Sequence, residues 1–287
     1  MQSSQKSEIQ KLLSDFCETL GSQSAAAKRL DDVSEATISQ MLKNNWQNIS
    51  DAMWRNVGKQ VGWNHHKTQQ FVETLNAQTL LLYFETAKEH GETFAITATA
   101  GSGKTFVGQH YARAMRGKNV YHLECAEYLN RRYFLIELMK IMGLPSGGMN
   151  IYEMMEEIIS TLRSQDHPLI IMDEVDKLKP EVLLFFITLY NKLHGLCGIV
   201  WTSTSAIVTK IDKGVHANKI GYNEIFSRIG RRFITLPGLN KKEAEAICAG
   251  YDITDPTEVS SIWNESEGDI RRIDRNDVKN KMKNRRA

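Results

Sequence analysis

The stretch TATAGSGKT, residues 97–105, decides how most of this chain is expected to fold. It fits the phosphate-loop pattern G-x-x-x-x-G-K-[ST], except that Ala98 stands at the first glycine. Gly101 and Gly103 take positive φ without steric cost, so the N–H groups of the loop can converge on phosphate. Ala98 lies where the chain leaves the preceding strand, and a methyl group is tolerated there if φ stays negative. The stretch therefore predicts a nucleotide-binding loop between a strand and a helix.

The loop residues bring distinct chemistry to a triphosphate. Lys104 is expected to reach the β- and γ-phosphates, and the Thr105 hydroxyl is expected to hold Mg²⁺. A Gly- and Ser-rich turn that ends in a lysine is the alternative, which the strand–loop–helix context disfavours. The residues expected to bind the nucleotide are Thr99, Ala100, Gly101, Ser102, Gly103, Lys104, Thr105 and Phe106.

A second motif, PLIIMDEVD at 168–176, places two carboxylates at the C-terminal end of an apolar strand. Ligands of open α/β sheets bind at that edge. Asp173 is expected to hold Mg²⁺, directly or through water, and Glu174 to polarise the attacking water as general base. A solvated turn is the alternative, and the four apolar residues before Asp173 argue against it.

Composition and charge restrict the class of protein. Of 287 residues, 41% are hydrophobic and 24% charged, the balance of a globular protein. The net charge of +2 gives no strong hint of nucleic acid. The four cysteines lack ligand spacing, which disfavours a zinc site and fits a reducing cytoplasm. The chain shows neither a signal peptide nor an apolar run near the ~20 residues of a bilayer span, so we expect a cytoplasmic protein without membrane contact.

The chain divides into three expected regions: a helical domain at 1–65, an α/β domain at 66–240 and a helical segment with a basic end at 241–287. Strand–helix alternation in the second region predicts a doubly wound α/β domain with a parallel sheet. The expected strands are 93–99, 119–125, 168–173, 198–205 and 232–236, and the expected helices are 104–116, 128–142, 151–163 and 180–194.

Residues 23–44, QSAAAKRLDDVSEATISQMLKN, predict a helix–turn–helix module. Ser34 is the expected N-cap of the second helix. On its exposed side we expect Gln40 to reach a base edge and Lys43 to contact a phosphate of DNA. Compact helical packing without a DNA role is the alternative. The residues expected to pack the two helices are Ala27, Leu30, Ile38 and Leu42, and Glu35 and Thr37 join Gln40 and Lys43 on the exposed side.

Together the motifs resemble the AAA+ ATPases over roughly residues 66–275, and within them the DNA-transposition regulators of the phage Mu B type. The resemblance implies an AAA+ P-loop domain with a five-stranded parallel sheet, a C-terminal helical lid and an N-terminal helix–turn–helix domain. It implies ATP and Mg²⁺ as cofactors, and a bacterial or phage-encoded protein. The implied partners are double-stranded DNA, a cognate transposase, and further copies of the chain in a helical filament or ring. ATP binding would drive assembly, and hydrolysis would dissolve it.

Within this resemblance, the strand GIVWTSTS at 198–205 occupies the sensor-1 position. Thr204 best matches the residue that bonds the γ-phosphate or the attacking water, with Thr202 second; a strand end capped by hydroxyls is the alternative. EGDIRRID at 267–274 resembles the start of the sensor-2 helix, which implies that Arg271 touches the γ-phosphate from the lid.

The segment IFSRIGRRFITLPGL at 225–239 resembles the part of AAA+ proteins that carries the arginine finger. Arg228 is the favoured finger, with Arg231 and Arg232 as rivals, because a planar guanidinium suits the charge of the transferring phosphoryl group. The finger usually acts on the site of a neighbouring subunit, which implies ATP hydrolysis between subunits. A solvated basic turn is the alternative.

Other basic residues are candidates for DNA phosphate contact. Arg131 and Arg132 are favoured over Lys140 and Lys118, with a solvated helix start as the alternative. The tail at 279–287 is expected to hold DNA or a transposase, or to fray. Phe71, in the FVET segment, is expected near the adenine or in the core. Two other functions stay open: a helicase loader or replication-initiation ATPase, and an ATP-sensing transcriptional repressor.

Overall fold

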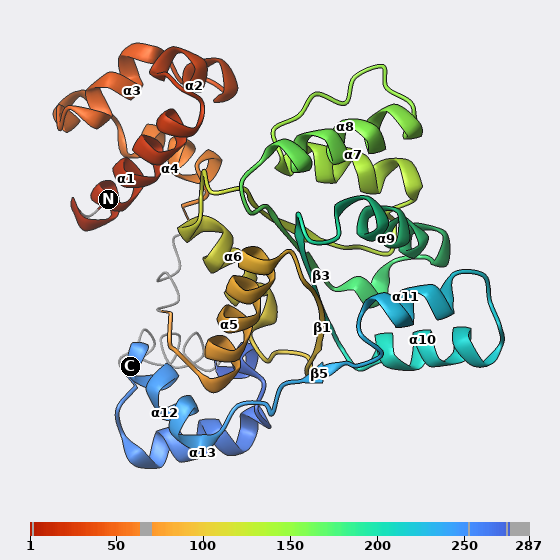
Figure 1. The fold of residues 1–287 in the computed structure, drawn as a ribbon. Coiled ribbons are helices and arrows are strands. Elements are labelled where there is room, and N and C mark those ends of the chain that lie inside the picture. Colours follow the sequence, from red (N-terminus) through yellow and green to blue (C-terminus); the bar gives the residue numbers. More distant parts are fainter. Residues whose placement is uncertain (2, 64–70, 252, 274, 276–287) are drawn as a thin grey trace. The chain divides into compact units, whose positions relative to one another are not determined.

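The computed structural model describes residues 1, 3–63, 71–251, 253–273 and 275 (Figure 1). The chain forms two compact units, Met1–Gln69 and Gln70–Ala287, each of which is described by itself. The expected boundary between residues 65 and 66, and the basic tail at 279–287, lie outside the described residues.

The first unit is entirely helical within its described residues, and its helices begin at serine caps. The side chains of Ser22, Ser34 and Ser50 accept hydrogen bonds from backbone N–H groups in the first turns of α2, α3 and α4. The expected N-cap at Ser34 is therefore confirmed. The elements are α1 (Ser3–Thr19), α2 (Gln23–Arg29), α3 (Glu35–Leu42), the 3₁₀ helix η1 (Trp46–Asn48) and α4 (Asp51–Gln60).

In both α2 and α3, one of the buried positions is shifted by one residue from the position expected to pack the core. Ala26 and Met41 are fully buried, whereas Ala27 and Leu42 are only partly buried. Ile38 is buried as expected. Gln10 on α1 also donates to the Met41 and Leu42 carbonyls, each at 3.0 Å. The contact of α1 with the end of α3 accounts for the shifted inner face.

The second unit is built on a five-stranded parallel sheet with the order β2-β3-β4-β1-β5. Each strand falls within an expected range, so the parallel α/β prediction is confirmed. The last strand is much shorter than expected, because only Ile234 and Thr235 pair with β1. The strands are β1 (Thr93–Thr97), β2 (Val120–Glu124), β3 (Leu169–Asp173), β4 (Gly198–Ser203) and β5 (Ile234–Thr235).

Helices cover both faces of the sheet, which explains why every residue of β3 and β4 is buried (Figure 1). Along β3, Ile170 and Met172 pack toward α7, α8 and α9, whereas Leu169 and Ile171 pack toward α5 and α6. The helices are α5 (Leu75–His90), α6 (Lys104–Ala114), α7 (Arg131–Ile141), α8 (Ile151–Ser164), η2 (Val175–Lys177), α9 (Pro180–Leu193), α10 (Ala206–His216), α11 (Tyr222–Arg228), α12 (Lys241–Gly250) and α13 (Pro256–Ser266).

The last helices form a small cluster of their own that stays attached to the sheet domain. Ile247 and Ile262 pack with Ile273 in this cluster, and Val72 packs against it from the segment before α5. Leu75 N also donates to the Glu243 carboxylate at 2.5 Å. Across the described parts of the chain, every helix is too short or too polar to cross a bilayer.

Candidate nucleotide site

The phosphate loop follows β1 directly and ends at the first residue of α6. Positive φ falls on Gly101 (76°) and Gly103 (88°), and not on Ala98. Ala98 is still part of the sheet, since its N–H donates to the Ser203 carbonyl at 3.1 Å. Its methyl group is buried in the core beside α5 and α6. Alanine at this position therefore leaves the loop geometry intact.

Lys104 is held inside the loop. Its Nζ donates to the carbonyls of Ala98 at 3.1 Å and Thr99 at 3.0 Å, and to the Ser102 hydroxyl at 3.3 Å. The residue is only 8% exposed, and this burial lowers the pKa of Lys104. The charges of Asp173 and Asp176 act in the opposite direction on that pKa. A buried ammonium in a ring of oxygen acceptors is suited to a polyphosphate.

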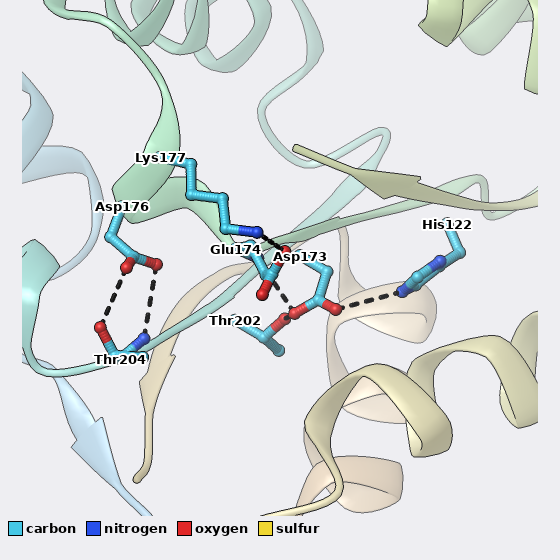
Figure 2. A network of polar contacts seen from close by, with 7 residues as sticks. All are labelled: His122, Asp173, Glu174, Asp176, Lys177, Thr202 and Thr204. Atoms are coloured by element: carbon cyan, nitrogen blue, oxygen red, sulfur yellow. Dashed lines mark hydrogen bonds and ion pairs between the residues drawn. The ribbon is translucent and has the colours of Figure 1, made fainter. Parts of the chain in front are cut away.

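Asp173 lies at the end of β3 and is fully buried. Its Oδ1 accepts from the Thr202 hydroxyl on the neighbouring strand β4 and from Glu174 N at 3.0 Å (Figure 2). Its Oδ2 has no hydrogen-bond partner among the described residues. The register explains the first bond, because Asp173 and Thr202 are directly opposite each other in the sheet.

Glu174 leaves the strand with φ of 56°, in the left-handed region that non-glycine residues seldom adopt. Its carboxylate pairs with Lys177 Nζ, and this hydrogen bond raises the pKa of Lys177 (Figure 2). The sequence prediction placed Glu174 beside the phosphate loop as general base but gave no role to Lys177. The structure puts Glu174 at the expected edge of the sheet with a cation already beside it.

Thr204, the favoured sensor-1 residue, follows β4 and is tied to a carboxylate that sequence reasoning missed. Its Oγ1 donates to Asp176 Oδ2 at 2.9 Å, and its N–H to Asp176 Oδ1 at 3.4 Å (Figure 2). Lys210 holds the same turn by donating to the carbonyls of Asp176 and Leu178. Thr202 and Thr204 are thus bonded to two different carboxylates, and which of them reads the γ-phosphate stays a prediction.

The segment at the start of the expected sensor-2 helix contacts the phosphate loop directly. Ile270 N donates to the Gly101 carbonyl at 3.0 Å. A β-carbon at Gly101 would lie 1.8 Å from Asp269 Oδ1, so only glycine fits under this carboxylate. The charge of Arg271 contributes to lowering the pKa of Lys104, and its own side chain is 64% exposed. The structure therefore brings Arg271 to the site, where its contact with phosphate stays a prediction.

Arg228 lies at the end of α11 and is bound by its own chain. Its Nε donates to Asn191 Oδ1 at 2.9 Å, and its guanidinium lies 5.7 Å from the centre of the Tyr190 ring. It also pairs with Glu224 at 3.2 Å. The alternative fingers, Arg231 and Arg232, are exposed in the turn before β5. The choice among the three arginines stays a prediction.

The residues predicted to bind DNA lie on the surfaces of both units. Gln40 and Lys43 are exposed on α3 and at its end. The Arg131 guanidinium lies 4.9 Å from the centre of the Phe185 ring, and Arg132 donates to the Met149 carbonyl at 2.9 Å. The remaining residues are Lys140, which pairs with Glu137, and Lys118, which is exposed.

An aromatic group lies beside α6. The rings of Phe71 and His110 stack with centroids 4.0 Å apart, and the Phe106 ring centre lies 6.1 Å from that of Phe71. Phe71 also packs against the core beside α5, which fits its interpretation as a core residue, and its position near the adenine stays a prediction. Leu75, which follows Phe71 at the first residue of α5, does not share this core position, because it is 50% exposed.

The donor set fits Mg²⁺, which prefers carboxylate and hydroxyl oxygens and is commonly held through one carboxylate and the substrate phosphates. Asp173 Oδ2 is a buried carboxylate oxygen that lacks a hydrogen-bond partner within the described chain. Thr105 supplies the expected hydroxyl on the first turn of α6. The residues in place therefore suit a magnesium–nucleotide complex.

The sheet order, the phosphate loop and the paired carboxylates define an AAA-type P-loop ATPase domain. The family described as the AAA domain matches residues 87–205, which run from the end of α5 to the end of β4. None of the curated proteins matches the chain.

Two solved structures resemble this chain weakly. NtrX from Brucella abortus, solved in complex with ATP, is 14% identical with a TM-score of 0.48 over 86% of this chain and 59% of that chain. Pif1 from Bacteroides sp., solved with ADP-AlF4, is 15% identical with a TM-score of 0.32 over 68% of this chain and 50% of that chain. This chain therefore spans about half to three-fifths of either protein, and such scores say nothing about its ligands.

Proposed function

We propose that this protein is an ATP-dependent DNA-binding protein of the AAA+ class that assembles on double-stranded DNA and presents it to a transposase. The proposal that the protein binds ATP rests on one observation. The Lys104 ammonium is buried in a loop that turns at two glycines, at the same edge of the sheet as Asp173 and Glu174. The transposition part is supported by the sequence resemblance to DNA-transposition regulators.

The loop and Lys104 would hold the β- and γ-phosphates of ATP, with backbone N–H groups at the start of α6 pointing at the charge. Mg²⁺, when bound, would neutralise phosphate charge and would be held by Thr105 and Asp173. Arg271 would contact the γ-phosphate from the segment that already touches the loop at Gly101. These residues bind and orient the substrate.

Hydrolysis needs a base beside the γ-phosphate. Glu174 would accept a proton from the attacking water as the water oxygen bonds to the γ-phosphorus and the bond to the bridging oxygen of ADP breaks. Lys177 pairs with Glu174 in this structure, so the carboxylate must turn away from that cation to meet water. We infer a slow basal rate that rises when DNA or a partner displaces Lys177.

DNA binding is assigned to the first unit and to the basic residues of the second. Exposed Gln40 and Lys43, on a helix with a serine N-cap, fit a helix that enters a major groove. An arginine from the 228–232 segment would complete the site of the next subunit, so ATP would favour assembly on DNA, and hydrolysis would reverse it.

The proposal is tested with purified protein, duplex DNA and a cognate transposase. The expected result is nucleotide-dependent coverage of DNA with a steep salt dependence and little sequence preference, together with stimulation of strand transfer. A helicase loader would assemble with ATP without stimulating a transposase. An ATP-sensing repressor would protect one operator independently of ATP.

A further inference from the structure

His122 is an unexplained polar residue in the middle of β2, a partly buried strand at the edge of the sheet. It pairs with Ile171 on β3, and because side chains alternate along a strand, it shares a sheet face with Asp173, two residues further on. That face is covered by α6, the helix that begins at Lys104. The imidazole therefore lies between the helix of the phosphate loop and the expected magnesium ligand.

The fold leaves a space for this ring. A β-carbon at Gly108 on α6 would lie 2.8 Å from His122 Cδ2 and 2.8 Å from Nε2. A side chain at position 108 would therefore force the imidazole to move, whereas glycine lets the helix pass over the ring where it lies. Gly108 follows Thr105 by about one helical turn, so the ring packs against the side of α6 that also carries the hydroxyl expected to hold Mg²⁺.

Two buried polar atoms face each other at this point. His122 Nε2 lies 3.9 Å from Asp173 Oδ2, and their side chains are 9% and 0% exposed (Figure 2). Within the described chain, neither atom has a hydrogen-bond partner. Buried polar atoms are nearly always satisfied, and the soft χ2 torsion of histidine gives the imidazole freedom to adjust toward a hydrogen bond with Oδ2.

We propose that His122 is a positioning residue that donates Nε2–H to Asp173 Oδ2 and thereby orients this carboxylate toward Mg²⁺. This inference rests on the proposed ATPase function. Each carboxylate oxygen accepts about two hydrogen bonds. Oδ1 already receives two, from Thr202 and Glu174. With His122 on Oδ2, one acceptor site remains for the metal or its water, and the carboxylate can no longer rotate.

The experiment separates this role from simple packing. The apparent affinity for a fluorescent ATP analogue is measured at rising Mg²⁺ concentrations and again in EDTA, for wild type, His122→Leu and His122→Gln. Glutamine places an N–H near the position of Nε2, whereas leucine fills the space without a donor. His90→Leu, at an exposed histidine at the end of α5, is the matched control.

The proposal predicts that His122→Leu needs about tenfold more Mg²⁺ for half-maximal binding, with unchanged affinity in EDTA, as expected for losing a hydrogen bond to a charged group. His122→Gln should restore most of the Mg²⁺ response. In an Asp173→Asn background, His122→Leu should have no further effect. If the leucine variant does not fold, His122→Asn, whose amide ends short of Oδ2, should give the same tenfold change.

Three results would overturn the proposal: a wild-type Mg²⁺ response in His122→Leu, an equal loss of affinity with and without Mg²⁺, or a glutamine variant as weak as the leucine one. A failure of the proposed function is distinguishable, because wild type itself would then bind no ATP analogue, and the role of His122 would fall with it.

Discussion

The N–H of Ile270 donates a hydrogen bond to the carbonyl of Gly101 at 3.0 Å, so the C-terminal segment is joined to the phosphate loop. The bond places Asp269 over the Cα of Gly101 and Arg271 near Lys104. Residues that are far apart in the sequence thus lie side by side at this loop. We expect this contact to couple the position of the segment to what the loop binds.

Gly101→Ala should uncouple this contact and weaken ATP binding at least tenfold. Its β-carbon would strike the Asp269 carboxylate, and φ of 76° costs a non-glycine residue ~1–2 kcal/mol. Gly117→Ala is the matched control, because φ there is 79° and nothing lies within 4 Å of its β-carbon. Both variants should lose similar unfolding free energy in denaturant melts, but only Gly101→Ala should lose ATP affinity. Equal ATP affinities would refute the coupling.

Glu174→Gln should keep ATP binding and lower hydrolysis by ~100-fold or more, the contribution of a general base. Single-turnover phosphate release measures the rate, and the variant should accumulate ATP-bound assemblies on DNA. Glu181→Gln, at an exposed residue in the first turn of α9, is the control and should hydrolyse ATP as wild type does. Loss of DNA binding in Glu174→Gln would instead contradict the switch model.

Arg228→Ala should reduce hydrolysis while nucleotide binding is retained. Because Arg228 also bonds Asn191 and Glu224, the variant should lose ~1 kcal/mol of unfolding free energy. Arg231→Ala and Arg232→Ala alter exposed residues and should leave stability unchanged. The steady-state rates of ATP hydrolysis of the three variants show which arginine acts as the finger. If Arg228→Ala hydrolyses ATP normally and a neighbouring variant does not, the finger is that neighbour.

Lys43→Ala should weaken DNA binding and reduce the slope of log K against log salt by about 0.9, the value for one phosphate contact. Lys59→Ala, at an exposed lysine in the last turn of α4, is the matched control. Fluorescence anisotropy over a salt series gives both slopes. Identical slopes for Lys43→Ala and wild type would remove this helix from the DNA interface.

Much of the fold could be predicted from the sequence, because local patterns decide it. Strands such as 169–173 are short apolar runs buried on both faces, and α6 begins where the glycine loop ends. The prediction was less accurate where contacts between distant parts of the chain set the length of an element. At β5, for example, only two residues pair with β1. The sequence patterns gave no expectation for α10 and α11, which pack on the face lined by Ile207 and Ile225.

The candidate site likewise has residues that the sequence predicts and residues that it does not. The motif positions of Lys104, Asp173 and Glu174 follow from the sequence, since they flank predicted strands. The partners of these residues do not, because His122 and Asp176 meet Asp173 and Thr204 only through sheet register and turns. One signal for His122 was present: its imidazole stands between Tyr121 and Leu123 in the run NVYHL, which is otherwise typical of a strand.

The central claim is that ATP at this site controls assembly on DNA, and electron microscopy of the protein with duplex DNA tests it most directly. With ATP and Mg²⁺, Glu174→Gln should form continuous helical assemblies along the DNA, and with ADP it should form none. Lys104→Ala, which lacks the buried ammonium of the loop, should leave the DNA bare with either nucleotide. Equal coverage with ATP, with ADP and in Lys104→Ala would contradict the account.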